Sequence, residues 1–134
     1  MTRTALRETT FLLLFRLDFY KDADLSEQIE LFFEGEDSYT EKEKQYVSEK
    51  VLAIAAHVEE LDKLIGDVSV GWKPQRMNRT DLSILRLACY EIKYEDSVPT
   101  STAINEAVEL AKNYGTENSG SFVNGILAKV VKND

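Results

Sequence analysis

Apolar residues recur at spacings of three and four along almost the whole chain, and this periodicity constrains the fold more than any other feature. The pattern is clear from Tyr46 through Val51 and Val58 to Ile65. Such spacing places side chains on one face of an α-helix, whereas a half-buried strand needs strict alternation of apolar and polar residues. No alternating pattern persists beyond a few residues. The sequence therefore predicts an all-α fold.

Capping residues and helix-ending glycines divide this pattern into six predicted helices. The first is predicted over residues 4–20 and is apolar nearly all round, which is typical of a buried central helix. Capping boxes at Asp24–Glu27 and Thr40–Glu43 begin the next two, and the second of these runs to Gly66. The last three helices are predicted over residues 80–94, 100–114 and 118–131, and Gly115 follows the second of them as a C-terminal cap.

Residues 66–79 form the main irregular connection, because they hold two glycines, Trp72 and Pro74. Three predicted helices stand on either side, so we expect two packed three-helix subdomains joined by this long connection. A chain of 134 residues is long enough to bury a substantial core, and we expect residues 1–134 to form a single domain. We interpret Trp72 as a plug between the subdomains rather than as a platform for a nucleic-acid base.

The cysteine and histidine content excludes several kinds of site. Cys89 and His57 are the only residues of their types, so an intrachain disulfide is impossible and the pair cannot complete a four-ligand zinc site. The apolar run Phe11–Phe15 is interrupted by Arg16 and Asp18, is too short to span a bilayer, and is not followed by a small-residue cleavage site. We therefore expect a cytoplasmic protein without a metal, a cofactor or a membrane partner.

The formal net charge of −8 is distributed unevenly. Residues 22–49 hold ten acidic residues against Lys42 and Lys44, which gives −8, so the rest of the chain sums to zero. Residues 1–21 are net +2 and residues 67–95 are net +1. A locally basic face that binds phosphate is thus compatible with the overall charge. The acidic segment is either a solvated face or a docking surface for a basic protein, and both interpretations stay open.

Small residues form a strip along the last predicted helix at Ser121, Gly125 and Ala128. A glycine inside a helix costs about 0.8–1 kcal/mol relative to alanine, so we expect a compensating interaction there. Close packing of a neighbouring helix is one interpretation, and close approach of a bound ligand is the other.

Polar side chains elsewhere suggest no enzymatic chemistry. Asn105, Glu109 and Lys112 share one helix face, but Glu109 and Lys112 have the i, i+3 spacing of a surface ion pair. Glu91 is interpreted as a structural partner of a basic side chain. The sequence contains no phosphate loop, nucleophile triad or dinucleotide-binding motif. We therefore expect a protein that is not an enzyme.

The second half of the chain carries a detailed family resemblance. The run from Asp81 to Glu91, then Pro99, INEAVELAK at 104–112, Tyr114-Gly115, Ser119 and FVNGIL at 122–127 resemble the C-terminal half of the NusB family. In the N-terminal half the resemblance rests on Arg7-Glu8 followed by an apolar helix that ends in Phe19-Tyr20.

The resemblance implies a NusB-like fold and an RNA-binding role in transcription antitermination. It implies binding to the boxA element of ribosomal-RNA leader transcripts together with NusE, a small-subunit ribosomal protein, which helps RNA polymerase resist termination. Other Nus factors and the polymerase would be indirect partners. Matching positions for RNA are the N-terminal Arg3 and Arg7 and, at the turn into the last helix, Tyr114, Asn118, Ser119, Ser121 and Phe122. The resemblance also implies that Asp81 faces NusE, while its place in the first turn of a helix favours a structural role.

The chemistry of that turn supports RNA binding independently. The N-terminus of a helix presents backbone amides and a partial positive charge that suit phosphate, and residues 118–121 are small and polar. Tyr114 and Phe122 flank the turn, and aromatic faces can stack on unpaired bases. For Phe122, a place in the core is the alternative.

Two positions depart from the family pattern, in which the N-terminus is often a cluster of arginines and a basic residue often stands at the position of Ser121. Since each lost cation removes a phosphate contact, we predict weak binding to RNA alone, with a slope of log affinity against log salt no steeper than about −4. NusE would then supply affinity as well as regulation.

Two other functions stay open at this stage. A NusB-like domain also resembles the N-terminal region of a ribosomal-RNA cytosine methyltransferase, but the sequence ends at Asp134 without a methyltransferase domain, and we expect the stand-alone form. The other alternative is a helical adaptor that binds proteins or supports ribosomal-RNA maturation through its acidic segment, without strong RNA affinity of its own.

Overall fold

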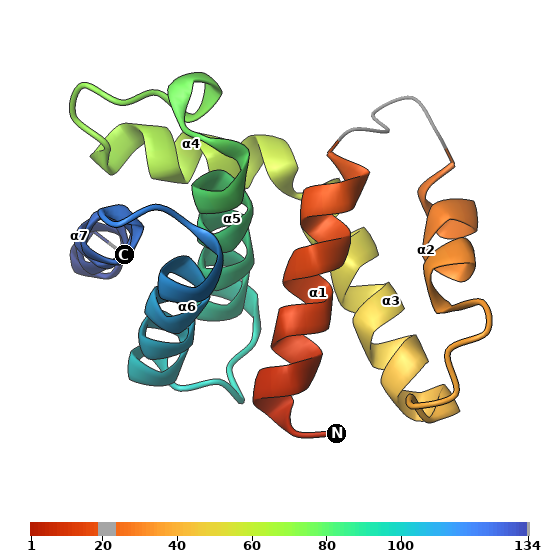
Figure 1. Ribbon diagram of the computed structural model, residues 1–134. Coiled ribbons are helices and arrows are strands. Elements are labelled where there is room, and N and C mark those ends of the chain that lie inside the picture. Colours follow the sequence, from red (N-terminus) through yellow and green to blue (C-terminus); the bar gives the residue numbers. More distant parts are fainter. Residues whose placement is uncertain (19–23, 134) are drawn as a thin grey trace. The chain divides into compact units, whose positions relative to one another are not determined.

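The computed structural model describes residues 1–18 and 24–133. These residues form seven α-helices and one 3-10 helix (Figure 1), which confirms the predicted all-α fold. The helices are α1 (Arg3–Leu17), α2 (Leu25–Phe33), α3 (Glu41–Ala56), α4 (Val58–Val68), η1 (Pro74–Arg76), α5 (Arg79–Tyr94), α6 (Thr100–Tyr114) and α7 (Ser119–Lys132). None of the described helices is long and apolar enough to cross a membrane.

The chain divides into two compact units, Met1–Ala56 and His57–Asp134. In the first unit, α1, α2 and α3 all pack against one another. Their shared core is formed by side chains from all three helices: Leu13, Leu17, Ile29, Phe33, Val47 and Val51. The predicted start of α1 is confirmed, whereas its predicted end at Tyr20 lies outside the described residues.

Side-chain caps fix where these three helices begin. The Oγ1 atom of Thr2 accepts a hydrogen bond from the amide of Ala5 at 3.0 Å. The Oδ1 atom of Asp24 accepts from the amide of Ser26 at 3.0 Å. At the start of α3, the Thr40 amide donates to Oε1 of Glu43 at 2.9 Å and the Glu43 amide donates to Oγ1 of Thr40 at 3.1 Å. This reciprocal pair is the capping box predicted from the sequence.

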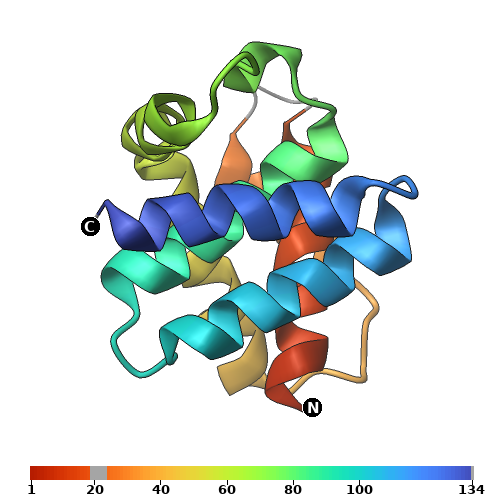
Figure 2. The same ribbon diagram turned by 90° about the vertical axis from the view of Figure 1, so that its left-hand side faces the viewer.

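The second unit is built around α5, which packs against α4, α6 and α7. The core-facing side chains of α5 are fully buried: Ile84, Leu85, Leu87, Ala88 and Cys89. Helices α6 and α7 lie side by side, joined by a short turn at residues 115–118 (Figure 2). This turn and the helix ends on either side of it hold five of the seven residues predicted to contact RNA.

The position of the division corrects one part of the sequence prediction. One helix was predicted from Thr40 to Gly66, but α3 ends at Ala56 and α4 begins at Val58, so the units contain three and four described α-helices rather than three each. His57 separates α3 from α4, with φ −105° and ψ 12°. The centre of its ring lies 4.7 Å from the centre of the Tyr94 ring. The apolar spacing continues across this break, and no glycine or proline marks it. The break therefore cannot be predicted from periodicity.

The predicted irregular connection is present between Val68 and Arg79, within the second unit, and it contains η1. Gly71 has φ +83°, a left-handed conformation that favours glycine. Trp72 next to it is 55% exposed. The connection thus lies inside one unit and the indole is mostly exposed, so the interpretation of Trp72 as a plug between the subdomains is wrong.

Candidate nucleic-acid interface

The turn between α6 and α7 is held by close contact between Gly115 and Ser119. A Cβ atom on Gly115 would lie 2.4 Å from Oγ of Ser119 and 2.8 Å from the carbonyl oxygen of Ala111, so only glycine fits without movement. The backbone of Gly115 is extended, with φ −95° and ψ −163°. Glycine is thus required here by space rather than by the left-handed conformation expected of a helix C-terminal cap.

Ser119 is 1% exposed, and its hydroxyl belongs to the turn itself. Its Oγ atom accepts a hydrogen bond from the Thr116 amide at 2.9 Å and lies 3.2 Å from the Thr116 hydroxyl. The Ser119 amide in turn donates to the carbonyl oxygen of Thr116 at 3.1 Å. Among the predicted site residues, Ser119 is therefore a positioning residue that shapes the turn.

Asn118 and Ser121 are exposed at the start of α7. The Asn118 side chain makes no capping hydrogen bond, and the Phe122 amide donates to the Asn118 carbonyl oxygen at 3.1 Å. The first amides of an α-helix have no partner within the helix and carry a partial positive charge. Asn118, Ser121 and these amides can therefore contact an anionic group at the same end of α7.

Two aromatic side chains flank the turn, as the sequence predicted. Tyr114 is the last residue of α6 and is 41% exposed. Phe122 is half-buried in the first turn of α7. Its ring lies 6.4 Å from that of Trp72, with 76° between the ring planes, which is an edge-to-face contact. Trp72 was not among the predicted site residues, because its sequence context showed only a connection between helices.

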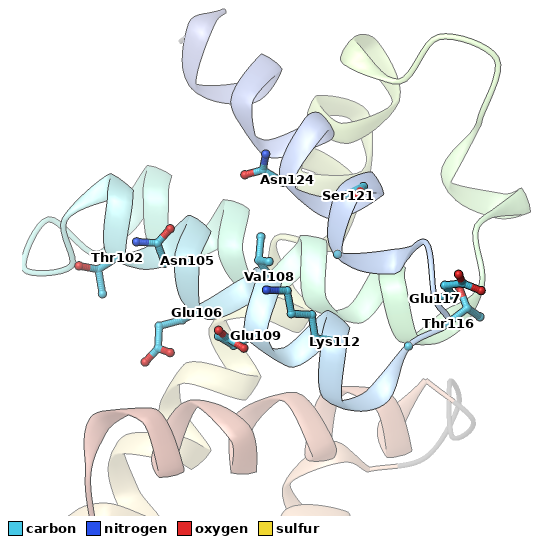
Figure 3. Close-up of a pocket in the computed structure, with 12 residues that line it drawn as sticks. Thr102, Asn105, Glu106, Val108, Glu109, Lys112, Thr116, Glu117, Ser121 and Asn124 are labelled. Carbon is cyan, nitrogen blue, oxygen red and sulfur yellow. The ribbon is translucent and has the colours of Figure 1, made fainter.

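A groove of about 860 Å³ runs between α6 and α7 (Figure 3). Its charged residues are Glu106, Glu109, Glu117 and Lys112, which sum to −2. Lys112 forms no ion pair with Glu109 in the described part of the chain, contrary to the spacing argument, and its Cγ atom would lie 3.4 Å from a Cβ on Gly120. The start of α7 lines one end of this groove through Gly120 and Ser121. The net negative charge disfavours a phosphate backbone along the length of the groove.

Arg3 and Arg7 lie together in the first unit. With Leu6 of α1 and Tyr46 and Lys50 of α3, they line a cavity of about 160 Å³. Arg3 is exposed, whereas Arg7 and Lys50 are buried. The Lys50 ammonium lies 3.2 Å from the Tyr46 hydroxyl and 5.4 Å from the centre of its ring. Lys50 was not predicted as a site residue. It follows several acidic residues in α3, so the sequence did not indicate that it belongs to a cationic cluster.

Asp81, the predicted position facing NusE, is buried in the first turn of α5. Its amide donates to Oδ1 of Asn78 at 2.8 Å, and Nδ2 of Asn78 donates to Oδ2 of Asp81 at 3.1 Å. Oδ1 of Asp81 is buried without a hydrogen-bond partner. These contacts give Asp81 a role in capping α5.

The candidate residues thus form two clusters, each within one unit. The first contains Arg3 and Arg7. The second, which we call the α7 turn cluster, contains Tyr114, Asn118, Ser119, Ser121 and Phe122. The residues of the α7 turn cluster are close together in the sequence, so their proximity in space is expected. The structure adds a contact between Trp72 and Phe122 of this cluster.

Known proteins match this chain in sequence and in fold along nearly its whole length. The NusB family model matches residues 4–132. The transcription antitermination protein NusB of Agathobacter rectalis is 54% identical over 129 residues, covering 96% of this chain and 98% of that protein. A solved structure of NusB from T. maritima matches with a TM-score of 0.90 and 36% identity, covering 98% of this chain and 92% of the other.

A third match comes from a crystal structure of the antitermination factors NusB and NusE in complex with double-stranded RNA. One of its chains matches with a TM-score of 0.85 and 26% identity, and each chain is covered completely, at 100%. The fold and these relatives define a class, the all-helical transcription antitermination proteins. The chain belongs to the NusB family, which confirms the resemblance found in residues 81–127.

Proposed function

We propose that this protein is an RNA-binding transcription antitermination factor that binds boxA of ribosomal-RNA leader transcripts together with NusE. The observation that carries the proposal is the full-length match, at 26% identity, to a chain from the structure of NusB and NusE in complex with double-stranded RNA. Other Nus factors and RNA polymerase would be reached indirectly, through that complex. The protein would act in the cytoplasm as a non-enzymatic factor.

The α7 turn cluster supports this proposal through its chemistry. A phosphate at the start of α7 would meet backbone amides, the Asn118 side chain and the Ser121 hydroxyl, all on one exposed end of a helix. Tyr114 and Phe122 stand beside that end and offer aromatic faces to unpaired bases. Ser119 and Gly115 would contribute by holding the turn in shape.

The N-terminal cluster would add phosphate contacts. Arg3 is exposed and suits a phosphate oxygen directly, and Arg7 and Lys50 contribute positive charge to the same small cavity. We propose that each cluster contacts the RNA from its own unit, so that residues 1–134 act as one RNA-binding domain. Because the cations are few, we expect NusE to supply part of the affinity. We expect NusE to contact the start of α5, where the buried Asp81 caps the helix.

A retention assay tests the proposal. Labelled boxA RNA and a shuffled RNA of the same composition are each mixed with the protein, with and without NusE. We expect boxA to be retained weakly by the protein alone and more strongly with NusE, and the shuffled RNA to be retained less in both mixtures. If NusE binds but neither mixture retains boxA, the protein is an adaptor that binds proteins, and the antitermination proposal fails.

A further inference from the structure

Trp72 stands on an apolar and unusually exposed part of the second unit. Trp72 is 55% exposed and Val70 is 86% exposed, and Gly71 between them adopts the left-handed φ of +83°. Exposing an indole to water has a free-energy cost, since its large apolar surface stays hydrated. The structure of the connection therefore presents this side chain rather than burying it.

The chain segment that contains Trp72 is cationic. Residues 69–79 contain Lys73, Arg76 and Arg79 and no acidic residue, in a chain whose net charge is −8. Lys73 and Arg76 are exposed on either side of the buried Pro74 in η1. An aromatic face beside exposed cations, in a segment that itself holds no acidic residue, is the combination by which proteins hold single-stranded nucleic acid.

The ring contact with Phe122 joins this segment to the α7 turn cluster. The two ring centres are 6.4 Å apart at 76°, so the contact is edge-to-face. Such a contact fixes the orientation of an aromatic side chain and still leaves other parts of its surface accessible. A nucleotide at the start of α7 would therefore have Trp72 within reach of its neighbour along the strand.

We propose that Trp72 stacks on an unpaired RNA base and that Lys73 and Arg76 contact the phosphates next to it. The inference rests on the proposed function and deepens it, because it extends the RNA surface from the α7 turn cluster onto the 69–79 connection. The substrate class is single-stranded RNA, since the bases of a duplex are already stacked on one another and cannot reach an indole face. A stretch of several consecutive unpaired nucleotides is needed to span both places.

Tryptophan fluorescence tests this directly, because Trp72 is the only tryptophan in the chain. The probes are a single-stranded boxA RNA and the same sequence in a duplex, each titrated with and without a NusE preparation that lacks tryptophan. We expect the single strand to quench the emission and to protect Trp72 from acrylamide. We expect the duplex to do neither, even where it is bound.

Three variants accompany the titration, and circular dichroism checks that each is folded. Trp72→Ala should weaken binding of the single strand by about 5- to 150-fold, as expected for the loss of one stacked base. Trp72→Phe keeps an aromatic face and should retain most of the affinity. Val70→Ala, the matched control, removes exposed apolar surface from the same connection and should bind as the wild type does.

The outcomes separate this inference from the function on which it rests. If wild-type protein retains RNA but Trp72 emission is unchanged and Trp72→Ala binds normally, the stacking role is wrong and the proposed function stands. If NusE alone quenches Trp72 and RNA adds nothing, the surface is a protein-docking site and the inference is overturned. If no RNA is retained in any mixture, both fail together.

Discussion

Gly115 and Ser119 fit together so closely that a Cβ atom on Gly115 would lie 2.4 Å from Oγ of Ser119. The same Oγ atom accepts the Thr116 amide at 2.9 Å. One buried hydroxyl therefore fixes both the end of α6 and the start of α7. The candidate RNA-contacting residues on either side, Tyr114 and Phe122, take their positions from this contact.

Replacing Gly115 with alanine should destabilise the protein. The added methyl group would collide with Ser119 and with the backbone carbonyl of Ala111, and overpacking of this kind costs about 1–3 kcal/mol. Urea unfolding measures the change in the free energy of unfolding. RNA affinity should fall as well, because relief of the collision moves the turn.

Gly125→Ala is the matched control, with the opposite sign expected. A Cβ atom there meets nothing within 4 Å, and Gly125 lies inside α7. Alanine should therefore stabilise the helix by about 0.5–1 kcal/mol. The open space at Gly125 also means that no helix of the described residues packs against this position. Close helix packing is therefore not the reason for the small-residue strip. Equal destabilisation by both substitutions would contradict the account of the turn.

Tyr114→Ala should weaken binding of single-stranded boxA RNA by about 5- to 150-fold, the loss expected for one stacked base. Tyr94 provides a close control, because it too ends a helix and is 41% exposed, as Tyr114 is. Its ring contacts His57 and its hydroxyl donates to Glu60. Tyr94→Ala should therefore lower stability but leave the RNA affinity of the folded protein unchanged. A filter-binding titration of both variants decides whether Tyr114 has a specific role.

Ser121→Lys should strengthen RNA binding and increase its dependence on salt. Ser121 is exposed at the start of α7, so a lysine there would reach a phosphate held by the helix terminus. One added phosphate contact makes the slope of log affinity against log salt more negative by about 0.7 for a single strand. Ser121 and Asn124 both line the groove, but Asn124 lies about one turn further from the start of α7, so Asn124→Lys is the control and should change the slope less. Equal slopes for the two variants would place the phosphate elsewhere.

Cys89 should be unreactive in the folded protein. Burial raises the pKa of its thiol from 9.0 to about 12, and the nearby charge of Asp62 adds to this effect while Lys93 opposes it. Alkylation by iodoacetamide at pH 8 should therefore be slow and should become fast in urea. Because the pKa is raised on folding, the associated stability is fully present below about pH 9 and is lost as pH rises toward 12. Cys89→Ala should remove that part of the alkaline pH dependence, and rapid alkylation of native protein would contradict the buried position.

Much of the fold could be predicted from the sequence, because apolar periodicity and capping residues act locally. The capping box at Thr40 and Glu43 and the bounds of α6 are examples. The break at His57 could not be predicted, since two amphipathic helices in succession continue the same spacing. It depends on the packing of α4 against α5, which is a tertiary effect.

The candidate site was predictable to a similar degree. The turn residues are contiguous, so the family motif located them together. The sequence did not indicate that Ser119 is buried or that Gly115 is needed for space, because both depend on distances across the turn. Nor did it bring Trp72 to Phe122, which are far apart in the chain.

Mapping RNA crosslinks residue by residue tests the central claim most directly. Ultraviolet crosslinking of single-stranded boxA RNA to the protein, with NusE present, is followed by mass spectrometry of the crosslinked peptides. The account predicts crosslinks at Tyr114 and in the segment around Arg7. Crosslinks confined to the acidic segment at residues 22–49 would contradict it.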